Sequence, residues 1–168
     1  SEIITSVEIQ GSIAPTTMRK WFNGCKKLEK ADLSSIDASK LTDISQLFGN
    51  CKSLESVIFP ANMSAAQLEQ MSAVFNGCEK LTALDLSGWN TSKVTQMSNV
   101  FGGCKALTSL NVSGWDVSKV KNMDYIFSGC SSLTSLDIST WNVILGVNDS
   151  STGLSYGATG MFKGCSSL

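Results

Sequence analysis

The sequence contains no histidine, which removes the commonest general base, the commonest metal ligand and the usual switch near neutral pH. No apolar run approaches the roughly 18 residues that a membrane-spanning helix needs. The 13 Lys and Arg residues are spread among 14 Asp and Glu residues, so no basic patch for nucleic acid forms. Without His to activate a Ser or Cys nucleophile, no catalytic constellation is present. We therefore expect a protein that is not an enzyme and that uses no cofactor and no metal.

What the chain does contain is one four-residue pattern, Phe-x-x-Cys, written six times. The copies begin at Phe22, Phe48, Phe75, Phe101, Phe127 and Phe162. Their cysteines follow one another at steps of 26, 27, 26, 26 and 35 residues. A fixed period of this size is typical of a repeat protein in which each unit packs on its neighbours.

The 168 residues are expected to form one domain made of these repeats. A short N-terminal unit at 4–27 comes first, and a last repeat with an insertion occupies 133–167. The four regular repeats between them are 28–53, 54–80, 81–106 and 107–132.

Each repeat combines two hydrophobic periods. A segment such as Leu81–Leu86 reads L-x-x-L-x-L, which predicts a short half-buried strand. Val94, Met97, Phe101 and Cys104 then recur every three or four residues, which predicts the inward stripe of a short helix.

Polar and glycine residues stand where the ends of such helices are expected. Serines at the helix starts are predicted N-caps, and glycines at the helix ends suit a left-handed conformation. The serines are Ser39, Ser92 and Ser118, and the glycines are Gly77, Gly103 and Gly129. Stacking the repeats then predicts a parallel sheet of about six strands on one side, helices on the other, and a continuous core of Leu, Met and Phe rungs.

The six cysteines invite a disulfide framework, but their spacing favours another interpretation. Each Cys occupies the same position in its repeat, so stacking places the side chains in one ladder. Free Cys packs as a small apolar side chain, and we predict reduced, buried thiols. Bridges between neighbouring rungs are the alternative, so the cysteines do not decide the redox compartment.

The units at 81–104 and 107–130 carry the pattern L-T-S-L-D-L-S-G-W-N-T-S-x-V-x-x-M-x-x-M-F-x-G-C almost letter for letter. This pattern resembles that of the BspA-type leucine-rich-repeat surface proteins of bacteria, over essentially the whole chain. The resemblance implies export, display on the cell surface, and a role in adhesion or host interaction. With the two periods above, it leads us to expect an α/β fold: a right-handed leucine-rich-repeat solenoid with short parallel strands on one face and short helices on the other.

The polar residues inside the strand motifs are expected to form a ladder on the open face of the sheet, with one rung about every 4.8 Å. This candidate sheet-face ladder consists of Glu8, Asp32, Asp85, Asn111 and Asp137, with Ile58 in the third repeat. A carboxylate column could bind Ca²⁺. Neutral rungs separate Asp32, Asp85 and Asp137, however, so the order favours a solvated ladder that avoids like-charge neighbours.

The tryptophans at 89, 115 and 141 recur just after the strand motif. We predict that they pack in the core, and a strip that stacks on sugar rings is the alternative.

The largest departure from the repeat lies between Trp141 and Phe162, which are 21 residues apart, against 12 for Trp115 and Phe127. The nine additional residues fall within 144–158, a stretch rich in Gly, Ser, Asn and Asp that predicts a loop replacing or interrupting the helix. Loops on a rigid scaffold commonly carry recognition, and a tolerated insertion is the alternative. The candidate binding loop comprises Asn148, Asp149, Ser150, Ser151, Thr152 and Tyr156.

Together these observations favour a non-enzymatic binding and adhesion module on the outside of a bacterial cell. Its expected partner is a host or neighbouring-cell surface protein or glycan, and an open C-terminal edge would allow weak self-association. The alternatives are a carbohydrate-binding or assembly module of a larger surface protein, and a structural spacer.

Overall fold

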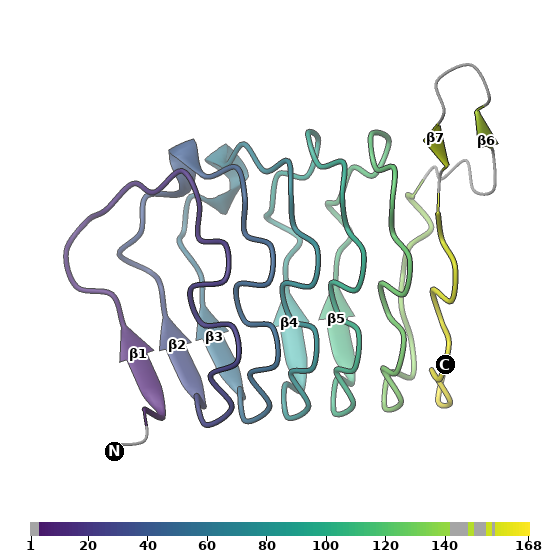
Figure 1. Cartoon of the computed structure of the whole chain (residues 1–168), viewed down its shortest axis with the longest axis horizontal. Helices are drawn as coiled ribbons and strands as arrows, with labels where there is room; N and C mark the ends of the chain where they lie inside the picture. The colour runs from purple at the N-terminus through teal and green to yellow at the C-terminus, as the bar shows by residue number, and fades with distance from the viewer. Residues whose placement is uncertain (1–3, 142–147, 150–153, 156) are drawn as a thin grey trace.

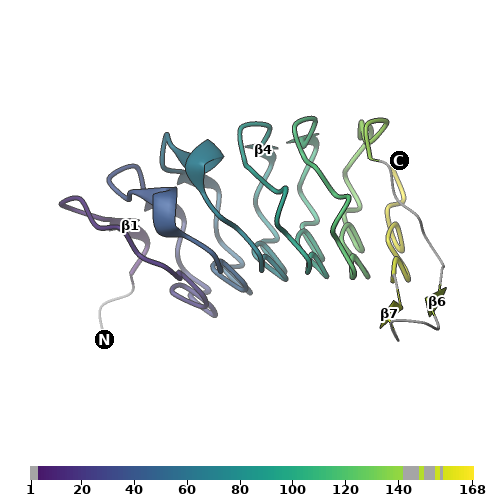
Figure 2. The same cartoon turned by 90° about the horizontal axis from the view of Figure 1, so that it is seen from above.

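The structure, a computed structural model, describes residues 4–141, 148–149, 154–155 and 157–168. The chain winds into a row of stacked coils with the two termini at opposite ends (Figure 1). Seen from above, the coils follow one another along one axis (Figure 2). Bridged residues in neighbouring coils are mostly 26 or 27 positions apart, as in Thr17–Asp43 and Asp43–Gln70, so each coil is one repeat of the sequence.

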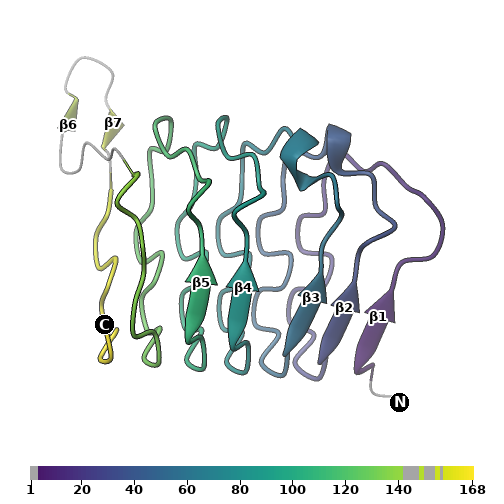
Figure 3. The same ribbon diagram turned by 180° about the vertical axis from the view of Figure 1, so that it is seen from behind.

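Short parallel strands lie on one side of the row, which we call the front (Figure 3). They are β1 (Ser6–Glu8), β2 (Lys30–Asp32), β3 (Ser56–Ile58), β4 (Ala83–Asp85) and β5 (Ser109–Asn111). The middle residue of each strand faces the core and its neighbours face outwards: Leu84 is buried, whereas Ala83 and Asp85 are exposed. The predicted period of two is therefore confirmed.

The front sheet is interrupted between β3 and β4, because β1–β3 form one hydrogen-bonded sheet and β4–β5 another. The amides of Leu33 and Leu86 donate to carbonyls of the following coil at 2.8 and 2.9 Å, whereas the equivalent amide of Phe59 donates to no described backbone carbonyl. The segment at 133–138 lies within the described residues but has no strand geometry, so the sixth predicted strand is absent.

The predicted helices on the opposite side, the back, are wrong. Residues 98–103 form consecutive turns, and the matching segments of the other repeats do the same. The helices in the described part of the chain are two 3-10 helices of three residues each, η1 (Ala38–Lys40) and η2 (Met63–Ala65). Neither lies in the segment for which the helical stripe was predicted.

Backbone amides at the back alternate between two kinds of partner. In the fourth coil, four alternate amides donate to carbonyls of the next coil at 2.7–2.9 Å; they belong to Met97, Asn99, Phe101 and Gly103. Gly102 and Cys104, which lie between or after them, donate back to the carbonyls of Asn99 and Phe101 within the same coil. The coils are thus hydrogen-bonded to one another at the back as well as at the front.

The spacing of the coils explains why turns replace helices. Packed helices lie about 8–10 Å apart, whereas hydrogen-bonded strands lie about 4.8 Å apart. A row with strands in front and helices behind must spread at the back, which would break the hydrogen bonds seen there. The stripe of Val94, Met97 and Phe101 fits the turns equally well, because these also return a side chain to the core every three or four residues.

Two left-handed residues, four positions apart, shape each back segment. The second position carries the predicted glycines, with φ of 73–75° at Gly77, Gly103 and Gly129. The first position carries six different residue types with φ of 55–61°, which are Lys20, Gln46, Ala73, Asn99, Tyr125 and Gly160. A left-handed residue at the third position of a four-residue turn is the requirement of a type II turn.

The predicted serine caps are also corrected. The residue two positions before each serine is the acceptor: Asp37, Asn90 and Asp116 take the amide hydrogens of Ser39, Ser92 and Ser118 at 2.9–3.2 Å. Asp and Asn favour this local bond, which turns the chain at a corner of the coil. The recurrent Asp/Asn-x-Ser pattern is therefore a corner signal rather than a helix start.

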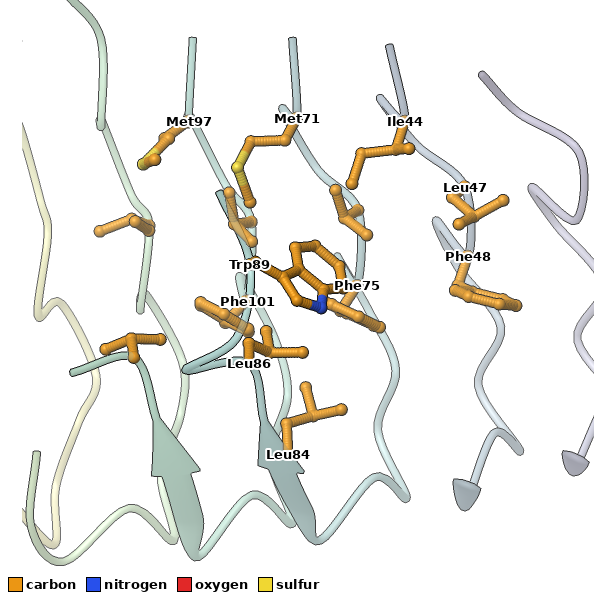
Figure 4. Packing of buried hydrophobic residues seen from close by; sticks show 14 of the residues in the cluster. Ile44, Leu47, Phe48, Met71, Phe75, Leu84, Leu86, Trp89, Met97 and Phe101 are labelled. Atoms are coloured by element: carbon orange, nitrogen blue, oxygen red, sulfur yellow. The ribbon is translucent and has the colours of Figure 1, made fainter. Parts of the chain in front are cut away.

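The core between the two faces matches the prediction of continuous rungs. Six phenylalanines stack along the row with ring centroids 5.3–6.0 Å apart, namely Phe22, Phe48, Phe75, Phe101, Phe127 and Phe162. The tryptophans pack beside them, as predicted: Trp89 is 5% exposed and lies among Leu86, Phe75 and Phe101 (Figure 4). Trp115 and Trp141 stack at 6.1 Å, and the indole of Trp115 donates to the carbonyl of Leu86.

The cysteines form the predicted ladder of free thiols. Four of them are fully buried, namely Cys51, Cys78, Cys104 and Cys130, while Cys25 in the first coil is exposed. Each buried Sγ donates to the carbonyl of the Phe one repeat earlier, as in Cys104 to Phe75 at 3.2 Å. Burial raises the pKa of both Cys51 and Cys130 to about 12, so these thiols stay protonated.

Candidate functional site

Four of the five ladder residues predicted for the open face lie on the front strands. Glu8, Asp32 and Ile58 are paired in register on β1, β2 and β3, and Asp85 is paired with Asn111 across β4 and β5. The fifth, Asp137, is exposed but belongs to no strand. The interruption of the sheet separates the ladder into two groups.

The carboxylates of the ladder lie on the open front face, and they also accept hydrogen bonds that stabilise the local turn. The hydroxyl and amide of Ser87 donate to Asp85 Oδ1 at 2.7 and 3.1 Å, and these bonds hold the pKa of Asp85 below its usual value. Serines two positions on lower the pKa values of Asp32 and Asp137 in the same way. The three aspartates of the ladder are therefore anionic corner residues.

A metal-binding cluster is not found among the described residues, since no group of three or more His, Cys, Asp or Glu side chains could hold an ion there. No helix in the described part of the chain is long and apolar enough to cross a membrane.

A cleft of about 280 Å³ lies where the sheet is interrupted. Its lining comes from both sides of the interruption: Phe59, Pro60, Ala61 and Met63 from the third coil, and Asp85, Ser87, Gly88 and Trp89 from the fourth. The cleft thus combines aromatic rings with one carboxylate.

Phe59 provides a physical reason for the interruption. Its counterparts Leu33, Leu86 and Val112 are smaller and fully or almost fully buried. The ring of Phe59 stands edge-on to Trp89 at 4.9 Å and to Phe75 at 6.0 Å, so it occupies space between the third and fourth coils. Figure 3 shows a wider space between β3 and β4 than between β4 and β5.

Ile58, beside this cleft, is exposed over 55% of its surface. The large apolar side chains exposed in the described residues otherwise belong to the first and last coils, namely Ile4, Ile13, Trp21, Phe162 and Leu168, apart from Tyr125 on the back. Ile58 is thus the one large apolar side chain exposed on the front of the interior coils in the described part of the chain.

The repeat pattern identifies Ile58 only as a neutral rung of the ladder, and it does not predict the cleft. Its signals were present: Phe59 stands where other repeats have Leu, Ile or Val, Pro60 follows it, and this repeat has one additional residue. Only the packing of Phe59 against the next coil shows that a phenylalanine at this position opens the sheet.

The insertion contains a short antiparallel hairpin of β6 (Asn148–Asp149) and β7 (Leu154–Ser155), which projects above the row in Figure 1. Asn148 and Asp149 of the predicted binding loop therefore lie on a strand. The other loop candidates, Ser150, Ser151, Thr152 and Tyr156, lie outside the described residues. The loop remains a prediction.

The repeat fold has a counterpart among solved structures. The chain is similar to a leucine-rich repeat protein from Eubacterium ventriosum ATCC 27560, with a TM-score of 0.52 and 18% identity over 88% of this chain and 33% of that one. This chain thus spans about a third of that protein, and the likeness supports a leucine-rich-repeat type of repeat fold. A leucine-rich repeat protein of T. pallidum matches with 22% identity over 79% of each chain, at a TM-score of 0.39.

No curated protein matches the chain. A family model does match, in two stretches that overlap and together run from residue 13 to residue 168, at 13–82 and 69–168. Since these matches cover almost the whole sequence, the chain belongs to the family described as "Mycoplasma protein of unknown function, DUF285".

Proposed function

We propose that this chain is a non-enzymatic protein-interaction module, part of a right-handed solenoid that displays its front on the outside of a bacterial cell. Its role there is adhesion to a host or neighbouring-cell surface protein. The resemblance to BspA-type surface proteins supports the location and the role, and the leucine-rich-repeat likeness supports the kind of module.

The observation that carries this proposal is the front surface around Ile58. An exposed apolar side chain stands between Asp32 and Asp85, next to a cleft floored by Phe59 and Trp89. Protein interfaces commonly place an apolar anchor at the centre and charged groups at the rim. The rim here is anionic, so the matching partner surface is basic and carries an aliphatic or long basic side chain that can enter the cleft.

Selection from a phage-displayed library of random peptides tests this proposal. Peptides enriched on the wild-type protein should be basic with an aliphatic residue. They should bind roughly tenfold more weakly to Ile58→Ser, since burying a side chain of this size contributes about 1.5–3 kcal/mol. Asp85→Asn should weaken binding in a salt-dependent manner.

The matched controls lie elsewhere on the molecule. Asn76→Ala changes the back and should leave peptide binding intact. Deletion of 146–156 removes most of the insertion. If this deletion abolished peptide binding while Ile58→Ser still bound the peptides, the interaction would lie in the hairpin and the front-face proposal would be overturned. Failure to enrich any peptide would favour the spacer alternative.

A further inference from the structure

A groove crosses the back of the molecule, opposite the front strands. Two hollows of about 340 Å³ each share Asn76 and Asn99, so together they form one continuous depression. The first is lined by Gln46, Gly49, Asn50, Ala73, Asn76 and Asn99. The second adds Gly77, Gly102, Gly103, Ser128 and Gly129. The groove therefore spans four coils, and none of its lining side chains carries a charge.

The carboxamides in this groove are free to bind something else. The side chains of Gln46, Asn50, Asn76 and Asn99 make no hydrogen bond to any described residue, whereas several amide side chains elsewhere do. Asn62 donates to Asp37 at 2.7 Å and Gln70 donates to Thr95 at 3.3 Å. Each free carboxamide offers two donors and an acceptor in one place.

Glycines make the room for these amides. The residue after each Phe is Asn23, Gly49, Asn76 and Gly102 in successive coils, so asparagine alternates with glycine. A Cβ on Gly49 would come 2.5 Å from Asn23 Oδ1, and one on Gly102 would come 2.7 Å from Asn76 Nδ2. The asparagine side chains therefore extend along the row over the glycines of the following coil.

The backbone amides that line the groove already donate to carbonyls, either of the next coil or of the same coil. The amides of Gly77 and Gly103 donate to the carbonyls of Gly102 and Ser128, both at 2.7 Å. An extended peptide would need a free strand edge or side-chain pockets, and the groove provides neither. A ligand that bonds through hydroxyl groups fits better, because each hydroxyl both donates and accepts.

An aromatic side chain stands at one end of the groove. Tyr125 occupies the position in its coil that Asn99 occupies in the preceding one, and both have left-handed backbone. Its ring lies over Gly160 of the last coil and is part of a side chain that is 37% exposed. An aromatic ring with one apolar face and a hydroxyl is suited to pack against a sugar ring.

We propose that this groove binds a neutral polysaccharide that lies along the row of coils. Successive sugar hydroxyls bond to the free carboxamides of Asn50, Asn76 and Asn99, and Tyr125 packs on a ring at the end. This site is on the opposite face from the protein-binding front, so the two proposals stand or fall separately.

Affinity electrophoresis of the whole chain through gels that contain dextran, mannan or galactan tests the proposal. At least one polymer should retard the protein, whereas its monosaccharide at the same mass should compete weakly, because only a polymer contacts several coils. The polyanion polygalacturonate should retard it no more than an empty gel.

Variants then locate the site. Asn76→Ala and Asn99→Gly each remove one carboxamide and should weaken binding by roughly fivefold to tenfold, since a hydrogen bond contributes about 1 kcal/mol. Glycine suits the left-handed backbone at 99, so a loss of binding there does not arise from misfolding. Asn111→Ala, an asparagine on the front, is the matched control and should bind normally.

Equal retardation of the wild type and the Asn76→Ala, Asn99→Gly double variant would overturn the proposal. So would retardation by none of the three polymers, or capture of an extended neutral peptide in place of the polysaccharide.

Discussion

At the residue scale, the Phe-x-x-Cys pattern serves packing, and each of its two named residues has a defined partner. The Phe ring stacks on the Phe of the neighbouring coil, and the Cys thiol donates to the carbonyl of the Phe one repeat earlier. This thiol bond explains why a small side chain with a weak donor recurs at the position. A buried carbonyl at the turn has a partner that alanine would not supply.

The buried thiols make stability depend on alkaline pH. Burial raises the pKa values of Cys51, Cys78, Cys104 and Cys130 above the ordinary 9.0, to about 12 for Cys51 and Cys130. Between these values the unfolded chain loses thiol protons that the folded chain keeps, so the free energy of unfolding falls as pH rises above about 9. Each thiol then lowers the free energy of unfolding by on the order of 1 kcal/mol near pH 10.

Urea unfolding at about pH 8 and about pH 10 measures this loss. Cys104→Ala is the control: it is less stable at the lower pH, but its loss between the two pH values should be smaller than that of the wild type by on the order of 1 kcal/mol. A stability that is the same at both pH values would contradict burial of the thiols.

At the element scale, the strands were predictable and the turns behind them were not. The alternation of apolar and polar residues specifies a strand, and the structure places β2 to β5 where it predicts them. The spacing of Val94, Met97 and Phe101 fits both a helix and a chain of turns, so periodicity alone could not separate the two. The deciding left-handed position holds Gln46, Ala73, Asn99 and Tyr125, which share no residue type that would reveal it.

Ala73→Gly separates a turn from a helix by the sign of its effect. Left-handed backbone costs an alanine about 1–2 kcal/mol that glycine avoids, while glycine adds about 0.5–1 kcal/mol of chain entropy. The variant should therefore be more stable than the wild type by about 0.5 kcal/mol. Inside a helix the same change would be destabilising by about 1 kcal/mol.

Thermal or urea unfolding of the variant gives the answer. Ala106→Gly, at a position without left-handed backbone, is the matched control and should be destabilised. A destabilised Ala73→Gly variant would restore the helix interpretation.

At the scale of the whole molecule, hydrogen bonds on both sides hold the coils in one row with two different faces. The back carries an uncharged groove rich in amides, and the front carries the aspartates of the ladder with Ile58 between Asp32 and Asp85. The sequence predicted the strand positions of Glu8, Asp32, Asp85 and Asn111, because one rung per repeat follows from the period, but not the absence of a strand at Asp137. It could not predict the cleft, because the cleft arises from Phe59 packing against Trp89 of the following repeat.

Residue-resolved amide exchange tests the proposed docking of a partner where the front sheet is interrupted. In the free protein, the Phe59 amide should exchange at least about tenfold faster than those of Leu33 and Leu86, which are hydrogen-bonded. Binding of an enriched basic peptide should slow exchange at Phe59 and leave back-face amides such as Gly103 unchanged.

In Phe59→Leu, the smaller side chain should let β3 approach β4, so the amide at 59 exchanges slowly without peptide. Equal protection of the Phe59 and Leu33 amides in the free wild type would contradict docking at the interruption. So would a peptide that slows amide exchange only at the back.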